Sequence, residues 1–207
     1  MMTMKRLAVI YLAMLFACQT AGAQSLEGLL RMFGLGGSSE KSEQTAEQPA
    51  APALTAEGLT GTWRYSEPAS RYDGSDVLGS IGIKAVEAML PSMYAKAGLS
   101  DGSGTITFTA PDTAGGQLGG YKVAGSYTFV PEEGSLTLTA EIGGVRGVLH
   151  GSATLDGDVL TLLFDAAEAA AIAERVSPAA ASNDTFKMLK SVLDKYPGVK
   201  LGCRMKR

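Results

Sequence analysis

The chain has 207 residues, with 21 acidic and 18 basic side chains and a formal net charge of −3. This acidic balance argues against a nucleic-acid partner, which would require a basic surface. With only two cysteines and one histidine, the chain lacks the ligand set of a typical structural metal site. We therefore predict no bound metal and no cofactor.

The N-terminus has the pattern of a secretory signal. Two basic residues precede an apolar run from Leu7 to Ala17, which is too short to span a bilayer but long enough for the core of a signal peptide. Small residues favour cleavage after Ala23, which would leave the protein periplasmic or extracellular and makes residues 1–23 the predicted signal peptide. The alternative is lipoprotein processing at Cys18, although Phe16 stands where that processing needs a small or β-branched residue. An acylated Cys18 is the only membrane anchor we predict.

Two short segments separate the signal from the folded domain. Residues 24–37 form an amphipathic stretch that ends at a pair of glycines. Residues 38–57 are rich in Ser, Glu, Gln, Ala and Pro, with Leu54 as the one large apolar residue, so we predict a disordered linker. Residues 58–207 remain for one domain with a single core.

The domain is predicted to begin with a strand and a helix. Residues 59–65 alternate apolar and polar side chains around Trp63, the only tryptophan, as a strand with one buried face does. Residues 76–97 read as a helix that ends at Gly98. Its apolar stripe is Leu78, Ile81, Ala85, Met89 and Met93.

Short strands joined by tight turns follow. Gly143-Gly144 and Asp156-Gly157 have the form of hairpin turns, so consecutive strands should be antiparallel neighbours. An up-and-down meander of this kind is expected to curl and close, because closure removes exposed sheet edges. The predicted strands are 105–109, 121–129, 136–141, 145–155 and 159–164; helices at 165–176 and 183–196 come next, and a last strand at 199–206.

The sequence offers little chemistry for catalysis. His150 lies on the polar face of its strand with no acidic residue two positions away on that face, and no serine-hydrolase or phosphate-binding motif is present. We predict that the protein is not an enzyme. Cys203 alternates with Leu201 and Met205, which indicates a buried small apolar side chain instead of a reactive thiol.

Aromatic side chains gather on the apolar faces of the predicted strands. They either form a simple core or line a cavity, because an eight-stranded barrel is about the size at which the interior fills with side chains or holds one small ligand. The candidate ligand-binding residues are Trp63, Tyr65, Phe108, Tyr121, Tyr127 and Phe129.

Several motifs resemble a known family. Gly61-Thr62-Trp63 is the Gly-x-Trp of lipocalins, and residues 59–207 resemble an uncharacterised group of secreted lipocalin-like proteins from Bacteroidetes. The matching pieces are Gly-Thr-Trp-Arg-Tyr (61–65), Gly-Ser-Tyr-Thr-Phe (125–129), Leu-Leu-Phe-Asp-Ala (162–166) and Leu-Gly-Cys-Arg-Met-Lys (201–206). The resemblance implies an antiparallel, calycin-type β-barrel and an exported location. Lipocalins often place an arginine across the tryptophan, and Arg204 is the candidate here.

Together these observations predict a mainly β protein: a lipocalin-like barrel with a helix after the first strand and two helices before the last. The expected function is non-covalent binding of a small hydrophobic or amphipathic ligand inside the barrel. Arg64, Arg146 or His150 at the rim could orient a polar head group. The alternative is a structural or protein-interaction module of the cell envelope, with a filled barrel and no ligand.

Overall fold

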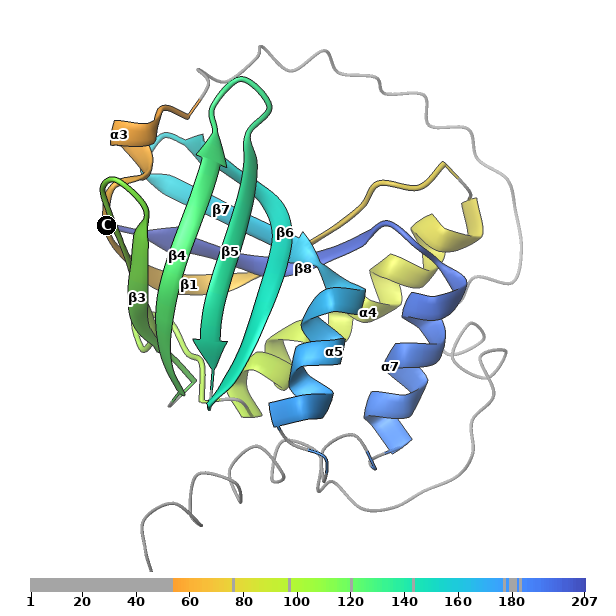
Figure 1. Cartoon of the computed structure of the whole chain (residues 1–207). Coiled ribbons are helices and arrows are strands. Elements are labelled where there is room, and N and C mark those ends of the chain that lie inside the picture. The colour runs from red at the N-terminus through yellow and green to blue at the C-terminus, as the bar shows by residue number, and fades with distance from the viewer. Residues whose placement is uncertain are drawn as a thin grey trace, which may run out of the picture.

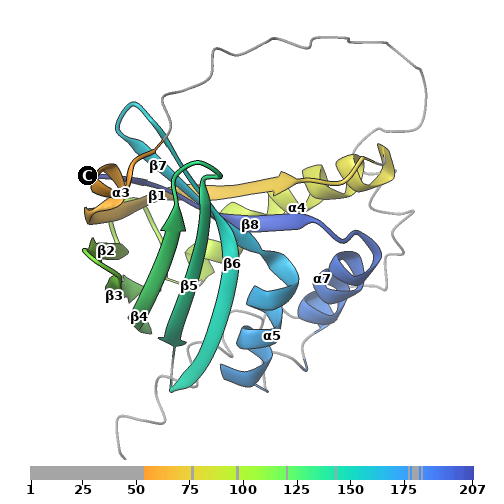
Figure 2. The ribbon, with the colours of Figure 1, turned by 45° about the horizontal axis from the view of Figure 1, so that its top comes forward.

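A computed structural model describes residues 54–207 apart from 76, 97, 120, 143, 177, 179–181 and 183. The predicted signal peptide, the amphipathic segment and the linker up to residue 53 lie outside the described residues. Eight antiparallel strands, each paired with its neighbours in the sequence, close into a barrel (Figures 1 and 2). The predicted closed antiparallel meander is confirmed.

The strands alternate buried and exposed side chains as the sequence pattern predicts. They are β1 (Gly61–Tyr72), β2 (Thr105–Thr109), β3 (Thr113–Leu118), β4 (Tyr121–Val130), β5 (Ser135–Ile142), β6 (Val145–Asp156), β7 (Val159–Asp165) and β8 (Val199–Lys206). The main helices are α3 (Ala56–Leu59), α4 (Val77–Lys96), α5 (Ala166–Val176) and α7 (Asp184–Lys195). None of these helices is long and apolar enough to cross a membrane.

The structure extends the sequence prediction in three places. Strand β3 was not predicted, because Gly115-Gly116 interrupts its alternation. Strand β1 continues to Tyr72, since its second half pairs with β8. Leu54 is buried and α3 begins at Ala56, so the fold includes the end of the segment predicted to be linker.

The helices match the predicted positions within one or two residues. Asp165 caps α5 as predicted, because its Oδ1 accepts from the backbone N of Ala167 at 3.0 Å and of Glu168 at 3.2 Å. The stripe predicted for α4 differs from the observed one. Ile83, Val86 and Leu90 are buried on it, whereas Met89 and Met93 of the predicted stripe are half-buried.

Two apolar cores result. The barrel core consists of inward side chains from all eight strands, together with Leu59 of α3 and Ile172 of α5. The helix core lies where α4, α5 and α7 pack against the extended β1–β8 pair. In Figures 1 and 2 these helices and α3 lie at opposite ends of the barrel. Tyr94 of α4 packs against both cores.

Candidate functional site: the barrel interior and its two ends

The α3 end of the barrel is sealed around Trp63. The side chain is 1% exposed, and its indole N–H donates to the Leu59 carbonyl oxygen at 2.8 Å. The guanidinium of Arg207 lies 4.6 Å from the centre of the indole ring. The same group donates to the carbonyl oxygens of Gly58 at 2.8 Å and Thr60 at 3.3 Å. A hydrogen-bonded cation over the ring therefore closes this end.

The arginine over the tryptophan is Arg207, so the expectation of Arg204 is wrong. Arg204 points outward and pairs with Glu67 at 2.7 Å. The physical reason is strand alternation: Cys203 and Met205 are buried, which puts residue 204 on the outer face. Residue 207 follows Met205 by two positions and returns to the tryptophan side, which is the signal in the sequence that could have identified it.

We expect Arg207→Ala to lower the free energy of unfolding by about 1–2 kcal/mol, because it removes an exposed cation–π contact and two hydrogen bonds. Arg207→Lys keeps the charge but not the two-pronged set of N–H donors, so its free energy of unfolding should lie between those of Arg207→Ala and the wild type. Urea denaturation followed by Trp63 fluorescence measures both. Equal stability of all three proteins would contradict the structural role of the guanidinium.

Large side chains from the strands fill the part of the barrel next to α3. Phe108 is 1% exposed, and its ring meets that of Tyr127 edge-on, with centroids 5.1 Å apart. Around them, Leu136, Leu160, Leu162 and Met205 are completely buried. The structure thus brings three of the predicted ligand-binding residues, Trp63, Phe108 and Tyr127, into one densely packed cluster.

The wall formed by β3 to β6 is built differently. Ala114, Gly125, Ala140 and Gly147 are register partners on the four neighbouring strands β3 to β6. Because Ala114 and Ala140 are buried inside the barrel, this small-residue row faces the interior with no group larger than a methyl. The strands therefore contribute little side-chain volume to the interior along this row.

Side chains of the helices occupy that end of the barrel. A Cβ placed on Gly147 would lie 2.3 Å from Cδ1 of Ile172, so α5 packs directly against the small-residue row. On the opposite side of the barrel, the Tyr94 ring stacks on Tyr65, with centroids 5.9 Å apart and planes 18° apart. Its hydroxyl donates to the Gly202 carbonyl oxygen at 2.8 Å. Burial raises the pKa of Tyr94 above its ordinary range and that of Tyr65 to about 12.

The remaining two candidate residues lie at different ends of β4. Tyr121 begins the strand at the helix end, where it is half-buried like Leu118 and Ile142 beside it. Burial raises the pKa of its hydroxyl. Phe129 lies near the turn to β5 and is half-buried against the barrel core. The six candidates therefore do not form one site.

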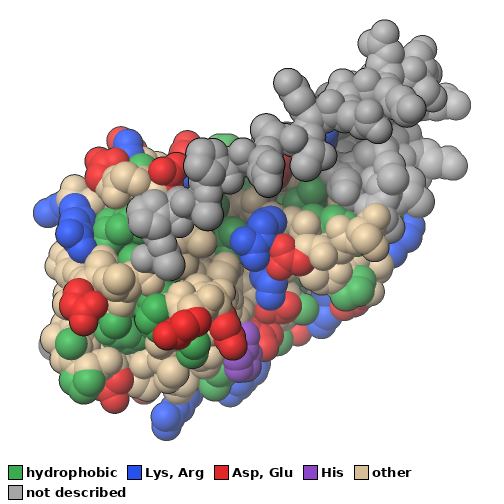
Figure 3. Space-filling model, turned by 90° about the horizontal axis from the view of Figure 1, so that it is seen from above, with side chains coloured by type: hydrophobic (Ala, Val, Ile, Leu, Met, Phe, Trp, Pro, Cys, Tyr) green, Lys and Arg blue, Asp and Glu red, His purple; other side chains and the backbone are tan. Residues whose placement is uncertain are grey.

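His150 has a carboxylate partner that the sequence did not reveal. Glu168 of α5 accepts from the backbone N of His150 and contacts its Nδ1, both at 2.7 Å. The periodicity of a strand compares only residues on that strand, so it could not identify a partner such as Glu168 that comes from a helix. The histidine side chain is 62% exposed; it is the purple side chain in Figure 3, with acidic side chains beside it.

The His150–Glu168 pair supplies an oriented imidazole but no further catalytic group. Within the described ranges, no hydroxyl or thiol is hydrogen-bonded to the His150 ring, and no three metal-ligating side chains gather. What the pair does structurally is hold α5 to β6. Arg175 of α5 adds a second hydrogen bond between these elements by donating to the Arg146 carbonyl oxygen at 3.2 Å. The absence of enzymatic activity stays a prediction.

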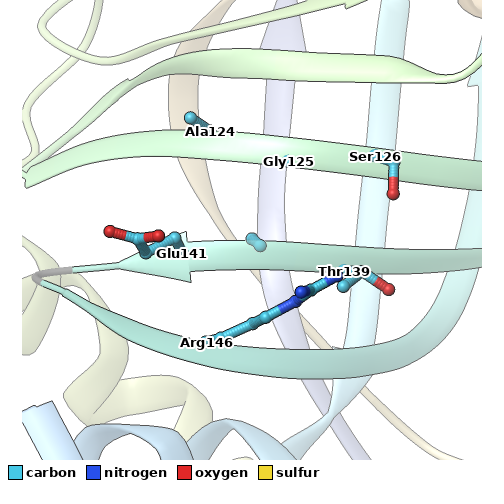
Figure 4. Close-up of a pocket in the computed structure, with 7 residues that line it drawn as sticks. Ala124, Gly125, Ser126, Thr139, Glu141 and Arg146 are labelled. Atoms are coloured by element: carbon cyan, nitrogen blue, oxygen red, sulfur yellow. The ribbon is translucent and has the colours of Figure 1, made fainter.

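A shallow hollow of about 260 Å³ lies on the outer face of β4, β5 and β6. Glu141 and Arg146 are register partners there, yet Figure 4 shows Arg146 reaching from β6 toward Thr139 of β5 and Glu141 pointing the other way. Arg64, Arg146 and His150 are all exposed on this outer side of their strands. The predicted rim residues therefore do not face the interior. The hollow is lined by Ala124, Gly125, Ser126, Thr139, Ala140, Glu141 and Arg146.

Cys203 is buried, as the strand pattern predicts. Burial raises its pKa from the ordinary 9.0 to about 12. A raised pKa means that the folded state favours the neutral thiol. The contribution of this thiol to the stability of the fold is therefore complete below pH 9 and is lost as the pH rises toward 12.

We expect Cys203 of the folded protein to react with a thiol reagent at pH 8 only after urea is added, since the thiolate is the reactive form. Between pH 9 and pH 10.5 the wild type should lose more stability than Cys203→Ala, which has no thiol to ionise. Rapid labelling of Cys203 in the native protein would contradict its burial.

A closed antiparallel barrel of eight strands, sealed at one end by a short helix, a tryptophan and an arginine, is a lipocalin-like barrel. Residues 38–207 match a family described as a lipocalin-like domain (DUF4923), and the chain belongs to this family. The matched range includes the segment predicted to be linker. The chain matches no curated protein and no solved structure.

Proposed function

We propose that the protein is an exported carrier that binds one small apolar or amphipathic molecule, non-covalently, in the helix-side part of the barrel. One observation carries the proposal: the small-residue row presents nothing larger than a methyl group to the interior, and Ile172 of α5 packs against its end at Gly147. Side chains of a strand cannot leave the barrel without breaking the sheet. Side chains of a covering helix can be displaced while every strand pair stays intact.

The residues have different roles in this proposal. Trp63 and Phe108 hold the α3 end closed, where the packing leaves no room for a ligand. Tyr65 and Tyr121 lie toward the helices, where aromatic faces can contact an apolar guest. Binding would gain its free energy mainly from removing apolar surface from water.

The test is native mass spectrometry of the protein produced in a bacterium with its own signal, followed by denaturing extraction of bound molecules. We expect a reproducible small apolar adduct on the wild type. Ala140→Leu fills the small-residue row and should lose the adduct. Leu136→Met changes a core residue near α3 at nearly constant volume and should keep it.

Two results would overturn the carrier proposal. One is a wild-type protein of bare mass that also takes up no hydrophobic dye when folded. The other is an adduct that Ala140→Leu retains at the wild-type stoichiometry, since the molecule would then lie elsewhere. The same spectra test export: the proposed mature chain begins at Gln24, whereas an acylated Cys18 would identify the lipoprotein alternative.

A second candidate is a structural or protein-interaction module of the envelope. The observation in its favour is that large buried side chains, among them Trp63 and Phe108, fill the part of the barrel next to α3. The outer face of β4 to β6 would then be the functional surface; Val148 there is 44% exposed. An empty wild type, together with unchanged behaviour of Ala140→Leu, would favour this candidate.

A further inference from the structure

We infer that Tyr94 stands in for the ligand, and that the molecule which replaces it is a small, neutral, planar compound with a hydrogen-bond donor, such as a phenol. This inference rests on the proposed carrier function and names the class of ligand. Its starting point is the position of Tyr94, which packs against the barrel core and the helix core at once. No strand contributes this side chain, although it packs with the barrel interior.

The contacts of the Tyr94 side chain define what the site recognises. One face of the ring lies on Tyr65, and the hydroxyl donates to the Gly202 carbonyl oxygen at 2.8 Å. Tyr65 is itself fixed, because its backbone N and O are bonded to Gly104 O at 2.8 Å and Gly102 N at 2.7 Å. The backbone that carries the Tyr65 ring and the Gly202 acceptor oxygen is therefore held by contacts that do not involve Tyr94.

The surroundings select a neutral guest. Burial, and after it the neighbouring Cys203, raise the pKa of Tyr94, and burial raises that of Cys203 to about 12. Both shifts report an environment that disfavours negative charge. A phenol can enter it without ionising, whereas a carboxylate would have to be desolvated with its charge.

Tyr94 can leave without unfolding α4. The helix is docked through Ile83, Val86 and Leu90 in the helix core, and Ser70 donates to Glu87 at 2.8 Å. Tyr94 lies one turn beyond Leu90, close to the end of the helix at Lys96. Gly98 follows with a φ of +77°, a conformation that glycine adopts at little cost. Rotation of the last turn alone would withdraw the ring.

The proposal predicts an order of affinities for p-cresol, which reproduces the tyrosine side chain. Tyr94→Ala should bind it most tightly, because the space is vacant. Tyr94→Phe keeps the ring stack but not the hydrogen bond, so its ring is easier to displace, and its affinity should be intermediate. Wild type should bind at least about tenfold more weakly than Tyr94→Ala, since it must first displace its own tyrosine.

The donor is tested with toluene, which has the same ring and methyl group without the hydroxyl. Tyr94→Ala should bind toluene at least about tenfold more weakly than p-cresol, because a site with a fixed acceptor discriminates against a ligand that lacks the donor. Tyr196→Ala is the matched control: it removes a tyrosine that packs against the helix core and should not gain p-cresol binding. Isothermal titration calorimetry and the shift of the melting temperature measure each affinity.

The outcomes separate this inference from the proposed function. Equal affinities of wild type, Tyr94→Phe and Tyr94→Ala, or equal binding of toluene and p-cresol, would overturn the role of Tyr94. An adduct in native spectra combined with that result would leave the carrier function standing. If neither p-cresol nor toluene binds to any of the proteins and the native spectra show no adduct, both the role of Tyr94 and the carrier function are rejected. If Tyr94→Ala does not fold, the comparison of Tyr94→Phe with wild type still decides the order.

Discussion

Trp63→Ala is expected to lower the free energy of unfolding by ~3–5 kcal/mol, the usual cost of truncating a buried tryptophan. The indole is 1% exposed and closes the α3 end of the barrel core. Its loss removes the N–H bond to Leu59 and the ring beneath Arg207 as well as the buried area. Urea denaturation followed by far-ultraviolet circular dichroism measures the change, because the mutation removes the fluorophore.

Trp63→Phe is the matched variant for this prediction. It keeps an aromatic ring at the site but loses the donor to Leu59 and part of the volume, so its cost should be clearly smaller than that of alanine. A loss of less than about 1 kcal/mol for Trp63→Ala would show that α3 and Arg207 do not depend on the indole. Although Trp63→Ala should be less stable, its folded fraction should bind p-cresol as well as the wild type does. The reason is that Trp63 does not lie in the helix-side part of the barrel.

The barrel could be predicted from the sequence because its strands carry a strong period of two. Trp63 and Tyr65, or Leu136 and Leu138, alternate with polar neighbours, and tight turns between strands leave no freedom in their order. Strand β3 could not be found this way. Its ladder with β2 and β4 is built from backbone hydrogen bonds around Gly115-Gly116, and glycine carries no side-chain pattern.

The candidate site could be predicted only in part, because helices contribute side chains to it. Residues Val77–Lys96 are apolar on more than one side, so periodicity selected a stripe through Met89 and Met93 and passed over Tyr94. The pairing of His150 with Glu168 depends on how α5 lies along β6, which no local pattern contains. Residues contributed by covering helices are set by tertiary packing, and the candidate list drawn from strands alone omitted them.

Gly125→Ala is expected to cost at least about 2 kcal/mol, because overpacking of a close-packed interior forces the backbone to shift. A Cβ at this position would lie 1.9 Å from the Thr139 carbonyl oxygen and 2.8 Å from Cα of Ala140, both main-chain atoms that cannot rotate away. Gly115 provides the matched control on the adjacent strand: a Cβ there meets only the Val123 carbonyl oxygen at 3.7 Å, so Gly115→Ala should be neutral or slightly stabilising.

Urea denaturation of both variants decides between two origins of the small-residue row. If Gly125→Ala is as stable as Gly115→Ala, the sheet tolerates a side chain at this point, and the absence of one must come from the need for space inside the barrel. If it is strongly destabilised, the bend of β4 against β5 itself requires glycine, and the space in front of the row is a consequence of how this barrel closes.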